Sequence, residues 1–349
     1  MDLIFLATFA LVLLLYLSWG VIFLPAERWQ ILATVPAMKR GAGDWHGVNF
    51  TWYGLLTANA YLVAVAVLLV LLGALGVSSL GTAMLVTSLL CCCVPASRLV
   101  AKLVEKKTDT FTVGGAVFVG ILVTPPVTML LNRTAGFLFN FHITVMGAYT
   151  AIAIAYAFGE GLGRLACISF GCCYGKPLHS CSAMVRRLFA GHCFVFHGQT
   201  KKITYAGGME ATEVIPIQAI TALVCSSSGL VATWLFLSSH QTAAFLLATV
   251  STQVWRILSE TMRADHRGGG NFSTYQFMGI VGLLYALCAA WFFRGESQTI
   301  PDLAAGLESI WRPELLLFLQ AIWLVIFLYT GRSTVTGAIL SFHVHRDRI

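Results

Sequence analysis

Nine long apolar runs divide this sequence and limit what the chain can fold into. A helix needs about 20 apolar residues to cross the hydrocarbon layer of a membrane. Runs that meet or approach this length lie at 3–24, 52–74, 79–97, 111–131, 142–159, 214–238, 241–258, 274–293 and 315–331. Charged residues make up only 11% of the chain, against roughly a quarter in soluble domains. We therefore predict an all-α polytopic membrane protein and exclude an ordinary soluble enzyme.

The two ends of the chain need separate interpretation. The first run is too long for the apolar region of a signal peptide and follows no basic segment, so we expect an uncleaved anchor. The ninth run is short and follows an amphipathic stretch, Leu303–Trp311. No fixed-period repeat is visible, which argues against an inverted-repeat transporter.

Polar residues concentrate at 164–213, the only sizeable extramembrane candidate. Alternating stretches at Cys193–His197 and Lys202–Tyr205 predict short strands, so we expect a small α+β head on the bundle. Cys181 and Cys193 lie in this head and can pair if it faces an oxidising compartment. The net charge is +7, but no run of Lys and Arg exceeds two residues, so we expect no nucleic-acid partner.

Charged residues at the end of the run 241–258 suggest a binding site. Arg256, Glu260 and Arg263 are spaced i, i+4 and i+7, which places them on one face of a helix. Charges at membrane depth usually mark a polar pathway or site, and two arginines held by a glutamate suit a phosphate group. The alternative is a helix-end cluster whose long side chains reach the membrane surface.

Arg164 and Arg98 each follow an apolar run. Arg164 comes after several small residues, including Gly163, that allow a backbone or ligand to approach closely. A cysteine group, Cys167 and Cys172-Cys173, follows Arg164. Its spacing is not a usual zinc spacing and no second cluster follows, so we predict no metal site and no cofactor.

Short motifs accompany these residues in a fixed order. They are Trp52-Tyr53-Gly54-Leu55, Ala96-Ser97-Arg98-Leu99, Gly114-Gly115, Gly163-Arg164-Leu165, Gly171-Cys172-Cys173-Tyr174-Gly175-Lys176-Pro177, Pro216-x-Gln218, Arg256-x3-Glu260-x2-Arg263-x-Asp265-x-Arg267-Gly268 and Ser273-x2-Gln276. Their order resembles the bacterial phosphatidylglycerol:prolipoprotein diacylglyceryl transferase family. The resemblance covers roughly residues 45–295 and implies a seven-helix core with the head at about 164–213. Residues 1–44 and 296–349 then add one span at each end.

The resemblance implies a lipid transferase that needs no cofactor. Such an enzyme moves the diacylglyceryl group of phosphatidylglycerol to the lipobox cysteine of a prolipoprotein signal peptide and releases glycerol phosphate. It implies catalytic roles for Arg164 and Arg256, with Glu260 orienting them. The residues expected to bind substrate are Tyr53, Arg98, Gly163, Arg263 and Gln276.

The sequence departs from the family where the acceptor thiol would be activated. The family's glycine-rich helix carries a histidine, and Val119 stands in its place. A free thiol has a pKa of about 8.5, so a proton acceptor helps to form the nucleophilic thiolate, and valine cannot act as one. Glu160, His142 and His46 are alternative bases. The Leu-Tyr-Glu segment that the family carries after Gln218 is also replaced, by Ala219-Ile220-Thr221.

These departures leave two further interpretations open. One is a paralogous phospholipid-dependent transferase with a different acceptor. The other is a non-catalytic membrane protein that binds anionic lipid, or a transporter.

The resemblance also implies a membrane orientation. It puts the protein in the bacterial inner membrane with the head in the periplasm. The basic loops at 25–51 and 98–110 then fall outside together with the head, whereas the positive-inside rule prefers the reverse. We expect the periplasmic head, with basic residues that bind lipid phosphate or a first span that does not fully cross.

Overall fold

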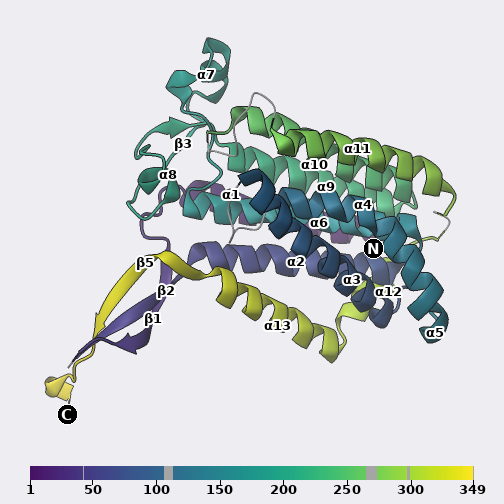
Figure 1. Ribbon diagram of the computed structural model, residues 1–349, viewed down its shortest axis with the longest axis horizontal. Helices are drawn as coiled ribbons and strands as arrows, with labels where there is room; N and C mark the ends of the chain where they lie inside the picture. The colour runs from purple at the N-terminus through teal and green to yellow at the C-terminus, as the bar shows by residue number, and fades with distance from the viewer. Residues whose placement is uncertain (42, 106–112, 265–272, 297–298, 349) are drawn as a thin grey trace.

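A bundle of long helices forms the body of the protein (Figure 1). The computed structural model describes residues 1–349 except 42, 106–112, 265–272, 297–298 and 349. Each of the nine predicted runs overlaps a long helix. These are α1 (Asp2–Phe23), α2 (Trp52–Ala74), α3 (Ser79–Val100), α4 (Val113–Leu131), α6 (Val145–Phe170), α9 (Ile217–Leu237), α10 (Gln241–Met262), α11 (Thr274–Phe293) and α13 (Pro313–Thr330). Within the described ranges, all but α10 are long and apolar enough to cross a membrane, which confirms the polytopic prediction.

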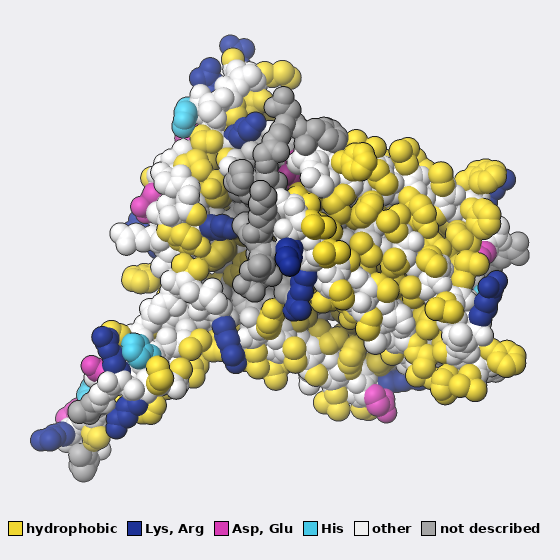
Figure 2. Space-filling view, viewed as in Figure 1, with side chains coloured by type: hydrophobic (Ala, Val, Ile, Leu, Met, Phe, Trp, Pro, Cys, Tyr) yellow, Lys and Arg dark blue, Asp and Glu magenta, His cyan; other side chains and the backbone are white. Residues whose placement is uncertain are grey.

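Apolar side chains cover the visible face of the bundle, whereas Lys and Arg collect over the head and over an arm at the same end (Figure 2). Large exposed hydrophobics include Leu14 on α1, Leu130 on α4 and Phe292 on α11. A surface of this size would be unfavourable in water, so the bundle is built to face lipid.

Helix α6 is the centre of the bundle and packs against α2, α9 and α10. Small residues on α6 permit this close packing, because a Cβ on Gly161 would lie 2.5 Å from Ser226 Oγ on α9. Helix α10 lies against α6, α9 and α11 and buries polar residues such as Thr252 and Gln253. Its polar face explains why α10 is less apolar than the other long helices.

One asparagine ties both added spans to the core. Asn59 on α2 accepts a hydrogen bond from Trp323 Nε1 on α13 at 2.8 Å. Its amide nitrogen donates to the Tyr16 hydroxyl on α1 at 3.1 Å. Hydrogen bonds between helices satisfy polar groups that lipid cannot, so α1 and α13 are integral parts of the bundle.

The arm is a three-stranded antiparallel sheet that the sequence did not predict. Its strands are β1 (Ile31–Lys39), β2 (Asp44–Thr51) and β5 (Arg332–Ser341), in the order β1-β2-β5. Segments near the two ends of the chain therefore pair with each other and project from the bundle (Figure 1). The amphipathic stretch before α13 forms α12 (Leu303–Ile310), which packs on α2.

The head extends from the end of α6 to the start of α9. It contains α7 (Ala183–Phe189), β3 (Phe194–Val195), α8 (Lys202–Tyr205) and β4 (Glu213–Val214), and β3 pairs with β4. The strand predicted at Cys193–His197 is thus found as β3, but the strand predicted at Lys202–Tyr205 is wrong. Backbone N–H groups of Thr204 and Tyr205 donate to Lys201 O and close a helical turn there.

The structure also gives the start of the head and the state of its cysteines. The predicted head began at 164, but Arg164 is still inside α6, which continues to Phe170. Cys181 and Cys193 are free thiols and are not paired.

Lys201 anchors the head to the bundle. Its side chain is fully buried, and Nζ donates to Leu24 O and Ser169 O at 2.9 Å each. These carbonyls follow α1 and end α6, so one ammonium group joins three segments. Burial lowers the pKa of Lys201 from 10.5 to about 8.

We predict that the protein becomes more stable as pH rises from about 8 to 10.5. In this window the unfolded Lys201 keeps its proton and the folded one loses it, which stabilises the folded state by up to about 3 kcal/mol. Thermal unfolding in detergent at stepped pH measures this effect. The Lys201→Met variant should lose this increase in stability with pH, and the control variant Lys202→Met should keep it. Identical pH profiles for the parental protein and both variants would contradict the assignment to Lys201.

Candidate active site

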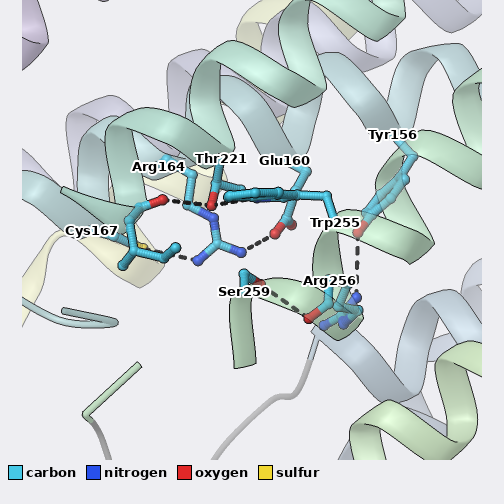
Figure 3. A network of polar contacts seen from close by, with 9 residues as sticks. Tyr156, Glu160, Arg164, Cys167, Thr221, Trp255, Arg256 and Ser259 are labelled. Carbon is cyan, nitrogen blue, oxygen red and sulfur yellow. Dashed lines mark hydrogen bonds and ion pairs between the residues drawn. The ribbon is translucent and has the colours of Figure 1, made fainter. Parts of the chain in front are cut away.

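A small pocket lies between α6, α9 and α10 (Figure 3). Its cavity volume is about 20 Å³. The residues that line it are Tyr156, Glu160, Arg164, Thr221, Cys225, Thr252, Trp255, Arg256, Ser259, Glu260 and Arg263. Four predicted site residues are therefore brought to one pocket: Arg164, Arg256, Glu260 and Arg263.

Arg164 is held by an acid one helical turn earlier. Its Nη2 forms an ion pair with Glu160 Oε1, and the two side chains are only 15% and 11% exposed. In a poorly hydrated interior such a pair is much stronger than on a surface. The structure thus shows Glu160 as the ion-pair partner of Arg164, which the sequence analysis did not predict. The i, i+4 spacing of the two residues on one helix could have indicated it.

Arg256 enters the pocket from α10. Its Nη1 donates to the Tyr156 hydroxyl on α6 at 3.3 Å, which links the two helices (Figure 3). A Cβ on Gly114 at the start of α4 would lie 2.9 Å from Arg256 Nη2 and 2.7 Å from Tyr275 Cδ1. The glycine therefore makes room for the guanidinium.

Both arginines keep unused hydrogen-bonding capacity. Within the described residues, the Nε atoms of Arg164 and Arg256 are buried and have no hydrogen-bond acceptor. Each Nε–H is therefore able to donate to an acceptor that enters the pocket. Phosphate oxygens are suitable acceptors, because a guanidinium binds them in bidentate fashion.

Backbone hydrogen bonds join the cysteine turn to the end of α10. Lys176 N donates to Met262 O at 2.9 Å, and Ala264 N donates to Tyr174 O at 3.1 Å. The motif that follows α6 and the motif that ends α10 thus form one structural unit. Asp265, Arg267 and Gly268 of the second motif lie outside the described residues.

The other predicted substrate-binding residues do not line the described pocket. Tyr53 lies on α2 against Phe170, with ring centroids 5.4 Å apart. Gly163 faces α2, where its nearest neighbour is Ala60. Arg98 is exposed near the end of α3.

Gln276 forms hydrogen bonds that fix the start of α11. Its Oε1 accepts from Ser273 N at 2.9 Å and its Nε2 donates to Ile257 O at 3.1 Å. With the Ser273 side chain this forms a capping box at the start of α11. We therefore assign Gln276 to capping α11 and fixing it to α10.

Of the alternative bases, Glu160 is in the pocket and the two histidines are remote. His142 is exposed before the start of α6, about 30 Å along that helix from Arg164. His46 is on β2 in the projecting arm. Val119 is half-buried on α4.

Three thiols come together beside this pocket, which the sequence spacing did not predict. The Sγ atoms of Cys167, Cys172 and Cys173 all lie within 4.8 Å of one another. Hydrogen bonding with the other two thiols, together with burial, raises the pKa of Cys172 well above its ordinary value. Without a bound cation, Cys172 is therefore a neutral thiol at neutral pH.

The fold and the pocket define a class: a multi-pass membrane protein with a pocket inside its helical bundle that is lined by three arginines and two acids. Comparison with known families gives the assignment. The family model for prolipoprotein diacylglyceryl transferase matches residues 43–292, and the chain belongs to that family. It is a membrane transferase of lipoprotein biosynthesis. No curated protein matches the chain.

We predict that Glu160→Gln lowers stability because it leaves Arg164 charged and unpaired. Breaking a buried pair by removing one partner costs about 3 kcal/mol. Thermal unfolding of Glu160→Gln, Arg164→Met and the double variant gives the coupling free energy. The double variant should lose less than the sum of the single losses. Additive losses would show that the pair contributes nothing.

Proposed function

We propose that this enzyme moves the diacylglyceryl group of phosphatidylglycerol to the lipobox cysteine of a prolipoprotein. The observation that carries the proposal is the pair of buried guanidinium groups, Arg164 and Arg256, whose Nε donors lack acceptors in one small pocket. Membership of the transferase family supplies the reaction class.

The charges of the pocket fit a phosphodiester. Three arginines, Arg164, Arg256 and Arg263, face two acids, Glu160 and Glu260. The formal sum is +1, which matches the single negative charge of a phosphatidylglycerol phosphate. As the phosphate leaves, its negative charge increases, and preorganised guanidinium groups stabilise that change without reorganisation.

The reaction exchanges one C–O bond for one C–S bond. The acceptor thiol loses its proton, and its sulfur attacks the glyceryl carbon that carries the phosphate ester. The C–O bond breaks, and the oxygen keeps the electron pair as glycerol phosphate departs. We assign phosphate binding to Arg164 and Arg256, held by Glu160 and Tyr156, with assistance from Arg263.

Glu260 and the residues outside the pocket complete the proposal. Glu260 lines the pocket and orients its arginines. Tyr53 contacts the lipid head group. Arg98 contributes to donor binding from the end of α3, and Gly163 contributes from the side of α6 that faces α2.

We place the protein in the bacterial inner membrane with its head in the periplasm. The pocket is close to the head, because Arg164 is six residues from the end of α6, about 9 Å along the helix. An acceptor cysteine presented outside the cytoplasm would reach this end. The basic arm lies at the same end as the head, where it can contact anionic lipid.

A second candidate is a transferase with the same donor and a different acceptor. Val119 cannot accept a proton, and none of the described residues that line the pocket is a histidine. The donor half of the site then stays as described and only the acceptor changes.

We predict that the full-length protein in phosphatidylglycerol liposomes adds a diacylglyceryl group to a lipobox peptide. Mass spectrometry follows the peptide and the released glycerol phosphate together. Glycerol phosphate with an unmodified peptide would favour the second acceptor. Neither product, with the protein folded and the peptide bound, would refute both proposals and favour a non-catalytic lipid-binding protein.

We predict that Arg164→Ala and Arg256→Ala each lower turnover by about 10²-fold or more, since each removes stabilisation of the leaving phosphate. Arg164→Lys should remain impaired, because an ammonium group keeps the charge and loses the bidentate geometry. Arg187→Ala, on the exposed helix α7, is the matched control. Parental rates in both alanine variants would show that the phosphate site lies elsewhere.

A further inference from the structure

The cysteine cluster, Cys167, Cys172 and Cys173, has no role in the chemistry proposed so far. The cluster does lie next to the pocket, because Arg164 Nη1 donates to Cys167 Sγ at 3.9 Å. Arg164 therefore touches both the pocket for the donor phosphate and the group of thiols. The acceptor half of the reaction, which lacks a histidine, is the half that this cluster can complete.

The chain builds the cluster through an unusual turn. Helix α6 ends at Gly171 with φ +65°, and Cys172 N donates to Cys167 O at 3.1 Å, which folds Cys172 back toward Cys167. Cys173 has φ 55°, a left-handed conformation that non-glycine residues rarely adopt. The buried Gln218 fixes the turn, since its Nε2 donates to Cys172 O at 2.9 Å.

The distances suit a thiolate-bound metal ion. A zinc–sulfur bond of about 2.3 Å in tetrahedral geometry places ligand sulfurs about 3.8 Å apart. The three Sγ atoms are all within 4.8 Å, so closing on an ion requires a shift of about 1 Å or less. Three thiolates select soft or borderline cations such as Zn²⁺. Three protein ligands also leave the fourth position open, which is typical of catalytic rather than structural zinc.

A cation lies beside the cluster and offsets part of its negative charge. Three thiolates and one divalent cation sum to −1, and the Arg164 guanidinium, which also pairs with Glu160, donates to Cys167 Sγ.

We propose that Cys167, Cys172 and Cys173 bind one Zn²⁺-type ion whose open position takes the acceptor thiol as a metal-bound thiolate. This proposal rests on the proposed function and supplies the activation that Val119 cannot. The thiol proton is released to solvent on binding. The sulfur then forms its bond to the glyceryl carbon, the C–O bond breaks toward the phosphate oxygen, and the metal keeps its oxidation state.

Metal content tests the site without any assay of turnover. The full-length protein is purified under reducing conditions, its zinc is measured by mass spectrometry, and Co²⁺ is substituted to give thiolate charge-transfer absorption. We expect about one ion per chain, and about one-tenth of that in Cys167→Ser, Cys172→Ser or Cys173→Ser. Cys288→Ser, which changes an exposed cysteine on α11, should keep the ion.

A fifth variant controls for loss of fold. Cys173→His replaces one ligand by another and should keep Co²⁺ with a weaker charge-transfer band. Failure of the parental protein to bind Zn²⁺ or Co²⁺ would overturn the proposal. So would a stable disulfide among the three cysteines under these conditions, or loss of the ion from Cys288→Ser alone.

Titration with peptides tests the open position. A lipobox peptide should shift the Co²⁺ spectrum and release about one proton per chain, whereas the same peptide with serine for cysteine should not. If neither peptide changes the Co²⁺ spectrum, the site is structural and the proposed activation step is overturned.

The transfer assay separates this inference from the proposed function. If transfer continues at the parental rate after a chelator removes the ion, the function stands and the metal proposal falls. If the thiol peptide binds Co²⁺ but neither metal form transfers lipid, the metal site stands and the proposed function falls.

Discussion

The ion pair between Glu160 and Arg164 is the interaction around which the rest of the structure is arranged. A guanidinium inside a membrane bundle is costly to desolvate, and a carboxylate one helical turn away offsets much of that cost. The ion pair stabilises the charged guanidinium but does not use all of its hydrogen-bond donors, because Nε makes no hydrogen bond within the described residues. A donor that is not used within the protein allows a buried arginine to bind an anion.

The helices around this pair are adapted to a polar centre. Helix α10 carries Arg256 and is less apolar than the other long helices. Among the nine long helices of the described residues, α10 is not a candidate membrane span by composition. Gly114 and Gly161 remove side chains where a guanidinium or a neighbouring helix must approach. Polar groups thus gather around the pocket inside a mostly apolar core, and the surface of the bundle that faces lipid is apolar.

The cysteine turn connects this polar centre to the head. It ends α6, bonds through its backbone to the end of α10, and packs near Lys201, whose ammonium binds the carbonyls of Leu24 and Ser169. The donor pocket, the thiol cluster and the anchor of the head therefore share one end of α6.

The sequence by itself determined the membrane class, the nine helices, the family and the arginines of the pocket. Apolar length decides whether a helix can cross lipid, and the spacing of Arg256, Glu260 and Arg263 reports one helix face. Both are local properties that a linear sequence contains.

Only the tertiary structure decided which groups meet. The partner role of Tyr156, the convergence of the three thiols and the fixing of Gln276 to α10 depend on contacts between elements or on the turn that ends α6. The β arm likewise needs residues 282 positions apart to pair, namely Phe50 and Arg332. Hydrophobic periodicity cannot report such pairing, because it describes the environment of each residue and not its partner.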